Sequence, residues 1–246
     1  MNLLLQLAFL FFIGSVIGWV IEVFFRRFFS SANPERKWIN PGFCTGPYLP
    51  LYGTGLCVLY LVASLEKYSI FGNQVADKIL LFVIMTVLMT VIEYIAGIWA
   101  LKVDHIRLWD YSNQWGNIQG LICPKFSLCW GLLGAVYYFL VHPHIKQALE
   151  WLGRNLAFSF FIGVFFGIFI IDFAHSKQIV SKLRKFARDN DLVIRYEHLK
   201  SNIRAYCTQT AGKYHFFRPF TSDRPITEHL KGLRDAFEKV KAKKKQ

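Results

Sequence analysis

Residues 3–25 read LLLQLAFLFFIGSVIGWVIEVFF, a stretch in which Glu22 is the one charged residue. A helix of about 20 apolar residues crosses the roughly 30 Å hydrocarbon core of a bilayer. Gly14, Gly18 and Glu22 recur every four residues and therefore share one helical face, where small residues let a neighbouring helix approach closely. The stretch predicts a membrane helix whose carboxylate faces protein instead of lipid.

Four more apolar stretches follow, at residues about 49–65, 79–101, about 121–141 and 156–173. Hydrophobic residues make up 54% of the 246 residues and charged residues 18%, below the roughly 25% charged content of soluble domains. This composition argues against an ordinary soluble enzyme, a disordered chain or a disulfide-stapled secreted module. We predict an all-α, polytopic membrane helical bundle of about five transmembrane helices.

The positive charge is concentrated at the C-terminal end of the chain. From residue 174 onward there are 18 Lys and Arg against 7 Asp and Glu, a net charge of +11, whereas the preceding residues carry the remaining +2 of the total of +13. We therefore expect a transmembrane domain over residues 1–175 and a basic cytosolic tail over residues 176–246. An amphipathic helix is expected over residues 226–240, with a stripe of Ile226, Leu230, Leu233, Phe237 and Val240.

Charge also predicts orientation and partners. Cytosolic loops of membrane proteins carry an excess of Lys and Arg, so we place this multi-pass chain in the cell membrane with its N-terminus outside and its C-terminus in the cytosol. Membrane lipid is the expected surrounding, and Lys241–Lys245 are expected to contact anionic lipid. No nucleic-acid-binding module is recognisable, so we expect no nucleic-acid partner.

Three carboxylates fall inside the predicted spans, at Glu22, Glu93 and Asp172. Burying a charged group in a membrane is costly, so each is a functional hypothesis by default, with helix packing as the alternative. Glu93 continues a polar and small-residue stripe of the third span. Gly163 and Gly167 predict a packing face on the fifth span, and Asp172 lies about 140° around the helix from Gly167.

Two connections bring further polar residues toward the same side. Residues 40–55, NPGFCTGPYLPLYGTG, contain three Pro and four Gly, which disfavour a regular helix. Such backbone survives at membrane depth only where protein or water satisfies its polar groups, so this segment is either re-entrant or an irregular cap over a cavity. The second connection carries the sequence WDYS at residues 109–112, followed by Asn117 and Gly120.

Other motifs are uninformative. The five Cys form no CxxC pair and read as small apolar residues, and we read His142-Pro-His144 as a solvated loop. We expect no metal and no cofactor. The sequence contains no Gly-x4-Gly-Lys-Ser/Thr, so the chain carries no ATP-binding P-loop.

The polar residues described above also carry a resemblance. Gly18-Trp19-x-x-Glu22, the series Asn40-x-Gly42-Phe43-x-x-Gly46-Pro47-x-x-Pro50-x-Tyr52-Gly53, then Glu93, Trp109-Asp110-Tyr111-Ser112 and Asn117-x-x-Gly120 resemble the bacterial ABC-transporter type IV family, also called CmpB-like. The resemblance covers roughly residues 1–175 and departs from the family at Pro41 and Cys44. It implies a transporter permease that works with a separate ATPase subunit.

We therefore expect an integral membrane transport component that lacks its own ATPase and has a cytosol-facing polar cavity. The residues expected to bind substrate or line this cavity are Trp19, Glu22, Asn40, Gly42, Gly46, Pro47, Tyr52, Glu93, Trp109, Asp110, Tyr111, Asn117 and Asp172. One alternative is an intramembrane enzyme that acts on a lipid or polyprenyl substrate, with carboxylates as general acid and base. Another is a membrane scaffold or assembly factor whose carboxylates only specify packing.

Overall fold

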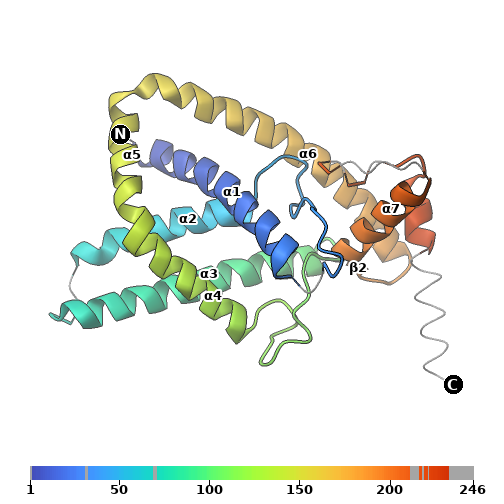
Figure 1. Ribbon diagram of the computed structural model, residues 1–246, viewed down its shortest axis with the longest axis horizontal. Helices are drawn as coiled ribbons and strands as arrows, with labels where there is room; N and C mark the ends of the chain where they lie inside the picture. The colour runs from blue at the N-terminus through green and yellow to red at the C-terminus, as the bar shows by residue number, and fades with distance from the viewer. Residues whose placement is uncertain are drawn as a thin grey trace.

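A computed structural model describes residues 2–30, 33–68, 71–210, 216–217, 219–220 and 222–232. Its long elements are α1 Leu3–Phe28, α2 Pro50–Ala63, α3 Gln74–Lys102, α4 Pro124–Val136, α5 His142–Arg154, α6 Ser159–Asp189 and α7 Tyr196–Thr210. They are joined by the 3-10 turns Ser64–Lys67 and Leu156–Phe158, the π-helical turn Tyr137–Val141, and two-residue strands β1 Ile106–Arg107 and β2 Ile194–Arg195. In Figure 1, α7 and the connections at residues 33–49 and 103–123 gather at one end of the bundle, here named the loop end, and α5 lies at the other.

The helices confirm a helical membrane protein. Within the described residues, four helical stretches are long and apolar enough to cross a bilayer, namely Leu3–Phe28, Gln74–Lys102, Pro124–Arg154 and Leu156–Asp189. Large apolar side chains remain exposed along them, for example Ile17 at 52%, Leu132 at 67% and Ile171 at 73%. Continuous apolar surface of this kind is typical of contact with lipid. The count of five spans stays a prediction.

The expected second span corresponds to α2, which is short. Its 14 residues extend only about 21 Å at 1.5 Å per residue. The backbone N–H of Leu49 donates to the carbonyl oxygen of Ser15 at 2.9 Å, so α2 begins beside the middle of α1. As predicted, the small-residue face of α1 packs closely: a Cβ atom on Gly18 would lie 2.2 Å from the Cβ atom of Tyr52 in α2.

The fourth stretch differs from its prediction at His142. We expected a solvated loop there, but His142 is buried and begins α5. Pro143 lies in the first turn of α5, where the missing backbone N–H of proline is tolerated. The π-helical turn Tyr137–Val141 connects α4 to α5 just before it. The hydroxyl of Tyr137 lies 2.8 Å from Nδ1 of His142, which gives the buried ring a polar partner.

The fifth predicted span is the beginning of α6, and its predicted packing face is wrong. A Cβ atom on Gly163 or Gly167 would meet no atom within 4 Å. α6 contacts α1 through aromatic rings instead, with centroids 4.5 Å apart for Phe12 and Phe165. Because large rings bridge a wider gap between the helices, the glycines are not needed for close approach.

The C-terminal region packs against the loop end. Strand β1 pairs in parallel with β2, which places Ile106 opposite Ile194. Residues 226–232 are helical, and Leu230 joins a buried cluster with Leu183 and Leu199. The amphipathic helix over residues 226–240 stays a prediction. Leu233, Phe237, Val240 and Lys241–Lys245 lie outside the described residues. The division at residues 175/176 stays a prediction, and α6 runs continuously across it.

Candidate functional site

The three predicted carboxylates all lie toward the loop end of the bundle. Glu22, Glu93 and Asp172 belong to α1, α3 and α6, and these helices run in the same direction in Figure 1. Glu22 and Glu93 lie toward the C-terminal ends of α1 and α3, whereas Asp172 lies near the middle of the longer helix α6. Their hydrogen-bond partners nevertheless differ, so the site consists of distinct parts.

Asp172 binds the Pro/Gly-rich connection. Its carboxylate accepts hydrogen bonds from the backbone N–H of Thr45 at 3.2 Å and of Gly46 at 2.8 Å. The hydroxyl groups of Thr45 and Tyr48 also donate to it. The neighbouring Cys44 is buried in the same connection. Asp172 thus satisfies non-helical backbone that would otherwise lack partners.

Asn40 organises the same connection from within. Its Nδ2 donates to the carbonyl oxygens of Cys44 at 3.3 Å and Thr45 at 3.1 Å. Its Oδ1 accepts from the backbone N–H of Gly42 at 3.2 Å and from Nε1 of Trp19 at 2.8 Å. One buried amide therefore closes the turn and attaches it to α1. Pro47, which we also predicted as a site residue, is exposed.

Lys200 of α7 reaches this connection from the C-terminal region. Its buried Nζ donates to the carbonyl oxygens of Asn40 at 3.1 Å and Gly42 at 3.0 Å, and lies 3.4 Å from Oε1 of Glu197. Burial lowers the pKa of Lys200 more than the charge of Glu197 raises it. These contacts hold α7 against the turn that Asn40 closes.

Glu22 belongs to a row of alternating charges that ends at Lys200. Arg26 lies 2.9 Å from Glu22 through Nε and 2.9 Å from Glu197 through Nη1. Burial by itself would raise the pKa of Glu197. The positive charges of Arg26 and Lys200 outweigh this effect, so the pKa of Glu197 is lowered. The row Glu22, Arg26, Glu197 and Lys200 balances two negative with two positive charges.

Glu93 has a different environment. Its Oε1 accepts from the hydroxyl of Tyr111 at 3.1 Å and its Oε2 from Nε1 of Trp130 at 3.0 Å. The ring of Trp130 lies 5.4 Å from the ring of Tyr52, whose hydroxyl donates to Glu22 at 2.9 Å. None of the ion pairs among the described residues includes Glu93. Tyr52 and Trp130 therefore link Glu22, which is paired with Arg26, to Glu93, which is bound by neutral donors.

Tyr111 keeps its proton in this arrangement. Burial raises its pKa, and the charge of Glu93 and the hydrogen bond to it act in the same direction, as do Glu22 and Tyr52. Its ring stacks on Phe126 at a centroid distance of 4.2 Å. Tyr111 is thus a fixed, neutral donor to Glu93.

The other site residues that we predicted between positions 109 and 120 stabilise the connection that contains them. Asp110 lies 2.8 Å from Arg107 and 3.5 Å from Arg195 of β2. Trp109 donates through Nε1 to the carbonyl oxygen of Leu121 at 2.8 Å. Asn117 accepts from the backbone N–H of Gly120 at 3.0 Å, a residue whose φ of 68° favours glycine. These contacts hold together the connection from which Tyr111 reaches Glu93.

Several residues of this site were missing from the sequence-based set. They are Arg26, Thr45, Tyr48, Trp130, Glu197 and Lys200. Arg26 was detectable, because it follows Glu22 by four residues, the spacing of a helical ion pair. No local pattern connects Lys200 to Asn40, which are 160 residues apart.

Two cavities lie away from these carboxylates. One of about 220 Å³ is lined in part by His105, Arg188 and Asp191, and one of about 520 Å³ opens at the end opposite to the loop end. Within the part of the chain that the structure describes, no three His, Cys, Asp or Glu side chains are grouped closely enough to hold a metal ion.

Comparison with known proteins assigns the family. Comparison with the curated proteins and with the solved structures finds no match. The family model described as "Putative ABC-transporter type IV" matches residues 9–177. This range includes most of α1, all of α2 to α5 and the N-terminal part of α6, together with the three carboxylates and both connections, but not α7. The chain therefore belongs to the ABC-transporter type IV family of membrane proteins.

Proposed function

We propose that this chain is the membrane subunit of a transporter whose ATP-hydrolysing subunit is a separate chain. The family is described as ABC-transporter-type, and the sequence contains no P-loop of its own. A transport cycle driven by ATP would therefore require a partner ATPase.

The observation that carries this proposal is the interrupted second span. We infer that residues 40–49 re-enter the membrane from the loop end and that α2 completes a fifth crossing. The backbone hydrogen bond from Leu49 to Ser15, which lies in the middle of α1, supports this inference. Asp172, Asn40 and Lys200 further support it, because they bind the backbone polar groups of this non-helical segment. Interrupted helices of this kind form substrate sites in many transporters.

Glu93 is the carboxylate that we assign to cargo. Glu22 is already paired with Arg26, whereas Glu93 accepts hydrogen bonds from the neutral donors Tyr111 and Trp130. Glu93 can take up a proton or a cationic group without breaking an ion pair. We propose that a cytosol-facing polar cavity opens between Glu93 and Tyr52 during transport. In this structure the side chain of Trp130 fills the space between them.

The function is tested by purifying the full-length chain from its native membrane through an N-terminal affinity tag. We expect an ATP-hydrolysing chain to co-purify in an amount equal to that of the membrane subunit. We also expect its ATP hydrolysis to be coupled to transport. Glu93→Gln should preserve this assembly and lower the turnover, because the shape is kept and the charge is lost. Glu35→Gln, at an exposed position of the connection between α1 and α2, is the matched control. A wild-type preparation without ATP hydrolysis contradicts the proposal.

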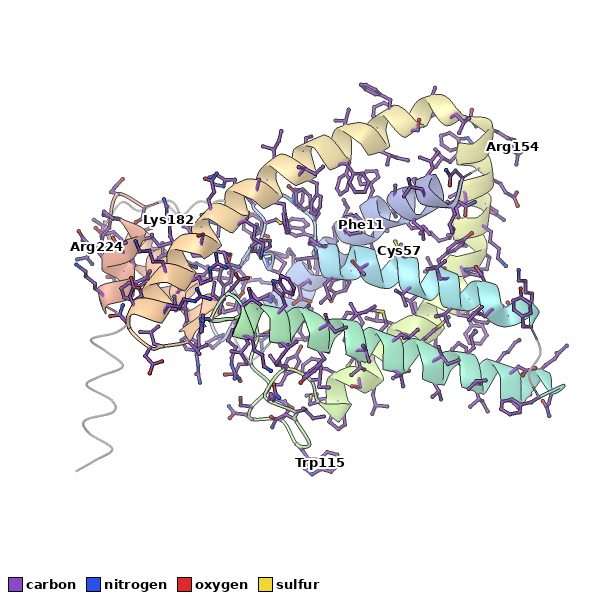
Figure 2. The ribbon with its side chains drawn as sticks, turned by 180° about the vertical axis from the view of Figure 1, so that it is seen from behind. Phe11, Cys57, Trp115, Arg154, Lys182 and Arg224 are labelled. Carbon is purple, nitrogen blue, oxygen red and sulfur yellow. The ribbon has the colours of Figure 1, made fainter. Side chains whose placement is uncertain are left out.

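The orientation is part of the same proposal. With the N-terminus outside and the C-terminus in the cytosol, Lys67 after α2 faces outward and Lys182 of α6 faces the cytosol. Both side chains are exposed, and Figure 2 labels Lys182 near the loop end. Lys67→Cys should react with an impermeant maleimide on intact cells, and Lys182→Cys only after the membrane is opened. The reverse pattern contradicts this orientation.

A membrane scaffold is the second candidate function. It is favoured by the hydrogen bonds that engage every one of the three carboxylates. If Glu93→Gln lowers thermal stability without changing ATP turnover, the scaffold explains the chain better. An intramembrane enzyme is less well supported, because Asp104, a further acid of the connection at residues 103–123, lies 3.5 Å from Lys177 and 3.7 Å from Arg184.

A further inference from the structure

An open cavity of about 520 Å³ lies at the end of the bundle opposite to Glu22, Glu93 and Asp172. Three helices line it: α1, α2 and α5. Its polar and small lining residues are Gln6, Tyr60, Lys146, Glu150, Gly153 and Arg154. Figure 2 labels Arg154 at the corner where α5 gives way to α6. The volume lies within the roughly 300–1,000 Å³ typical of small-molecule sites.

The lining is rich in hydrogen-bond donors and carries a net positive charge. Lys146 and Arg154 are cations, and Glu150, the one carboxylate of the lining, lies 3.8 Å from Arg154. The hydroxyl of Tyr60 donates to the side-chain oxygen of Gln6 at 3.2 Å, and the amide of Gln6 carries two N–H donors of its own. Two positive charges against one negative suit a ligand with a single negative charge.

A further polar group, His142, lies next to Tyr60. The ring of His142 is 6.0 Å from that of Tyr60 and only 3% of the residue is exposed. Nδ1 of His142 is engaged by the hydroxyl of Tyr137, but Nε2 has no hydrogen-bond partner among the described residues. A buried polar atom without a partner points to a bound water or ligand group nearby.

The cavity lies where a lipid headgroup would be found. α5 buries Ile145 and Leu149 against the bundle and exposes Lys146, the pattern of a helix at the membrane surface. Trp151, at the end of α5, is half-exposed, and Trp side chains are enriched at the membrane–water interface.

We propose that this cavity binds the phosphate group of a membrane phospholipid. Lys146 and Arg154 contact the phosphate oxygens, Tyr60 and Gln6 supply neutral donors, and Leu149 forms the apolar floor on which the glycerol backbone rests. A phosphodiester carries one negative charge, which matches the net charge of the lining. This site is independent of the transport function proposed above, because it shares no residue with the carboxylate site.

The test is native mass spectrometry on the full-length protein in detergent, titrated with dihexanoyl phosphatidylglycerol. A glucosyl diacylglycerol with the same acyl chains is the phosphate-free probe. We expect the phosphatidylglycerol to bind at least about tenfold more tightly, since charge-assisted hydrogen bonds are the strong ones. Lys146→Gln and Arg154→Gln should each weaken binding about tenfold, which corresponds to about 1.4 kcal/mol.

Two further variants complete the experiment. Gly153→Leu should block the cavity with all charges retained, and its backbone is not in the left-handed region that would exclude a side chain. Lys67→Gln, which removes a cation that does not line the cavity, should bind like the wild type. Equal affinity for both lipids, or wild-type binding by the two charge variants and Gly153→Leu, overturns the proposal.

Inorganic phosphate is the third probe, because the same donors would also hold a free anion. If it does not compete with phosphatidylglycerol at millimolar concentration, the lipid is the source of the phosphate group. If it competes at the concentration at which the lipid binds, a phosphate site is supported and its ligand is the free anion.

Discussion

The ammonium group of Lys200 lies 3.0 Å from the carbonyl oxygen of Gly42, although 158 residues separate them in the chain. Lys200 also binds Asn40 and Glu197. Helix α7, which carries Lys200, lies outside the residues 9–177 that match the family model. Lys200 nevertheless donates hydrogen bonds to backbone carbonyl groups of the Pro/Gly-rich connection, which lies inside the matched range. The C-terminal region therefore completes the structure of the loop end.

Replacing Lys200 with Met should loosen the turn at residues 40–46. Two buried carbonyl oxygens lose their donor, which we expect to lower the free energy of unfolding by about 2 kcal/mol. Cys44, which is only 2% exposed in this turn, should then react faster with a maleimide at pH 8. Lys185→Met, an exposed position of α6, is the control. Equal labelling of Cys44 in both variants would show that Lys200 does not hold the turn.

Adding one methyl group should distinguish the glycines of α1 from those of α6. A Cβ atom on Gly18 would lie 2.2 Å from the Cβ atom of Tyr52, whereas one on Gly163 would meet nothing within 4 Å. Gly18→Ala should lower stability by about 2 kcal/mol through overpacking, and Gly163→Ala should stay within about 1 kcal/mol of the wild type. Thermal unfolding in detergent measures both, and a Gly18→Ala variant as stable as the wild type would exclude the close contact.

Asp172→Asn should destabilise the Pro/Gly-rich connection. The amide retains one acceptor oxygen but presents its NH₂ group to donors that now lack a partner, at a cost of about 2 kcal/mol. Limited proteolysis should then cut within residues 40–49. Asp189→Asn, at the exposed C-terminal end of α6, should leave the pattern of fragments unchanged. If both variants give the same fragments as the wild type, Asp172 is not the anchor of this segment.

Acidification should weaken the contact between α1 and α7. Burial acts against ionisation of Glu197, but Arg26 and Lys200 lower its pKa below the ordinary 4.5. A depressed carboxylate pKa stabilises the fold above the unfolded-state value, and this stabilisation is lost as the pH falls through the folded-state pKa. Thermal stability should therefore decrease below about pH 4.5, and Glu197→Gln should show a shallower decrease. Parallel pH profiles for the two proteins would contradict the ion pairs.

Much of the architecture follows from local sequence patterns. Apolar length predicted the spans at α1, α3, α4 and α6, and the spacing of Gly14, Gly18 and Glu22 predicted a close helix contact on that face. Such predictions succeed because helix length and face depend on residues a few positions apart. The Gly163 and Gly167 face failed, since small residues permit close packing without requiring it.

The partners of the carboxylates depended on tertiary structure. The sequence by itself determined a basic, helical membrane protein with Glu22, Glu93 and Asp172 toward one end of the predicted apolar spans. Only the folded chain decided that Asp172 binds Gly46, 126 residues away, that Arg26 also pairs with Glu197, and that Glu93 accepts hydrogen bonds from the neutral donors Tyr111 and Trp130. The physical reason is that helix propensity and hydropathy act locally, whereas hydrogen-bond and ion-pair partners are chosen by how the helices and connections pack together.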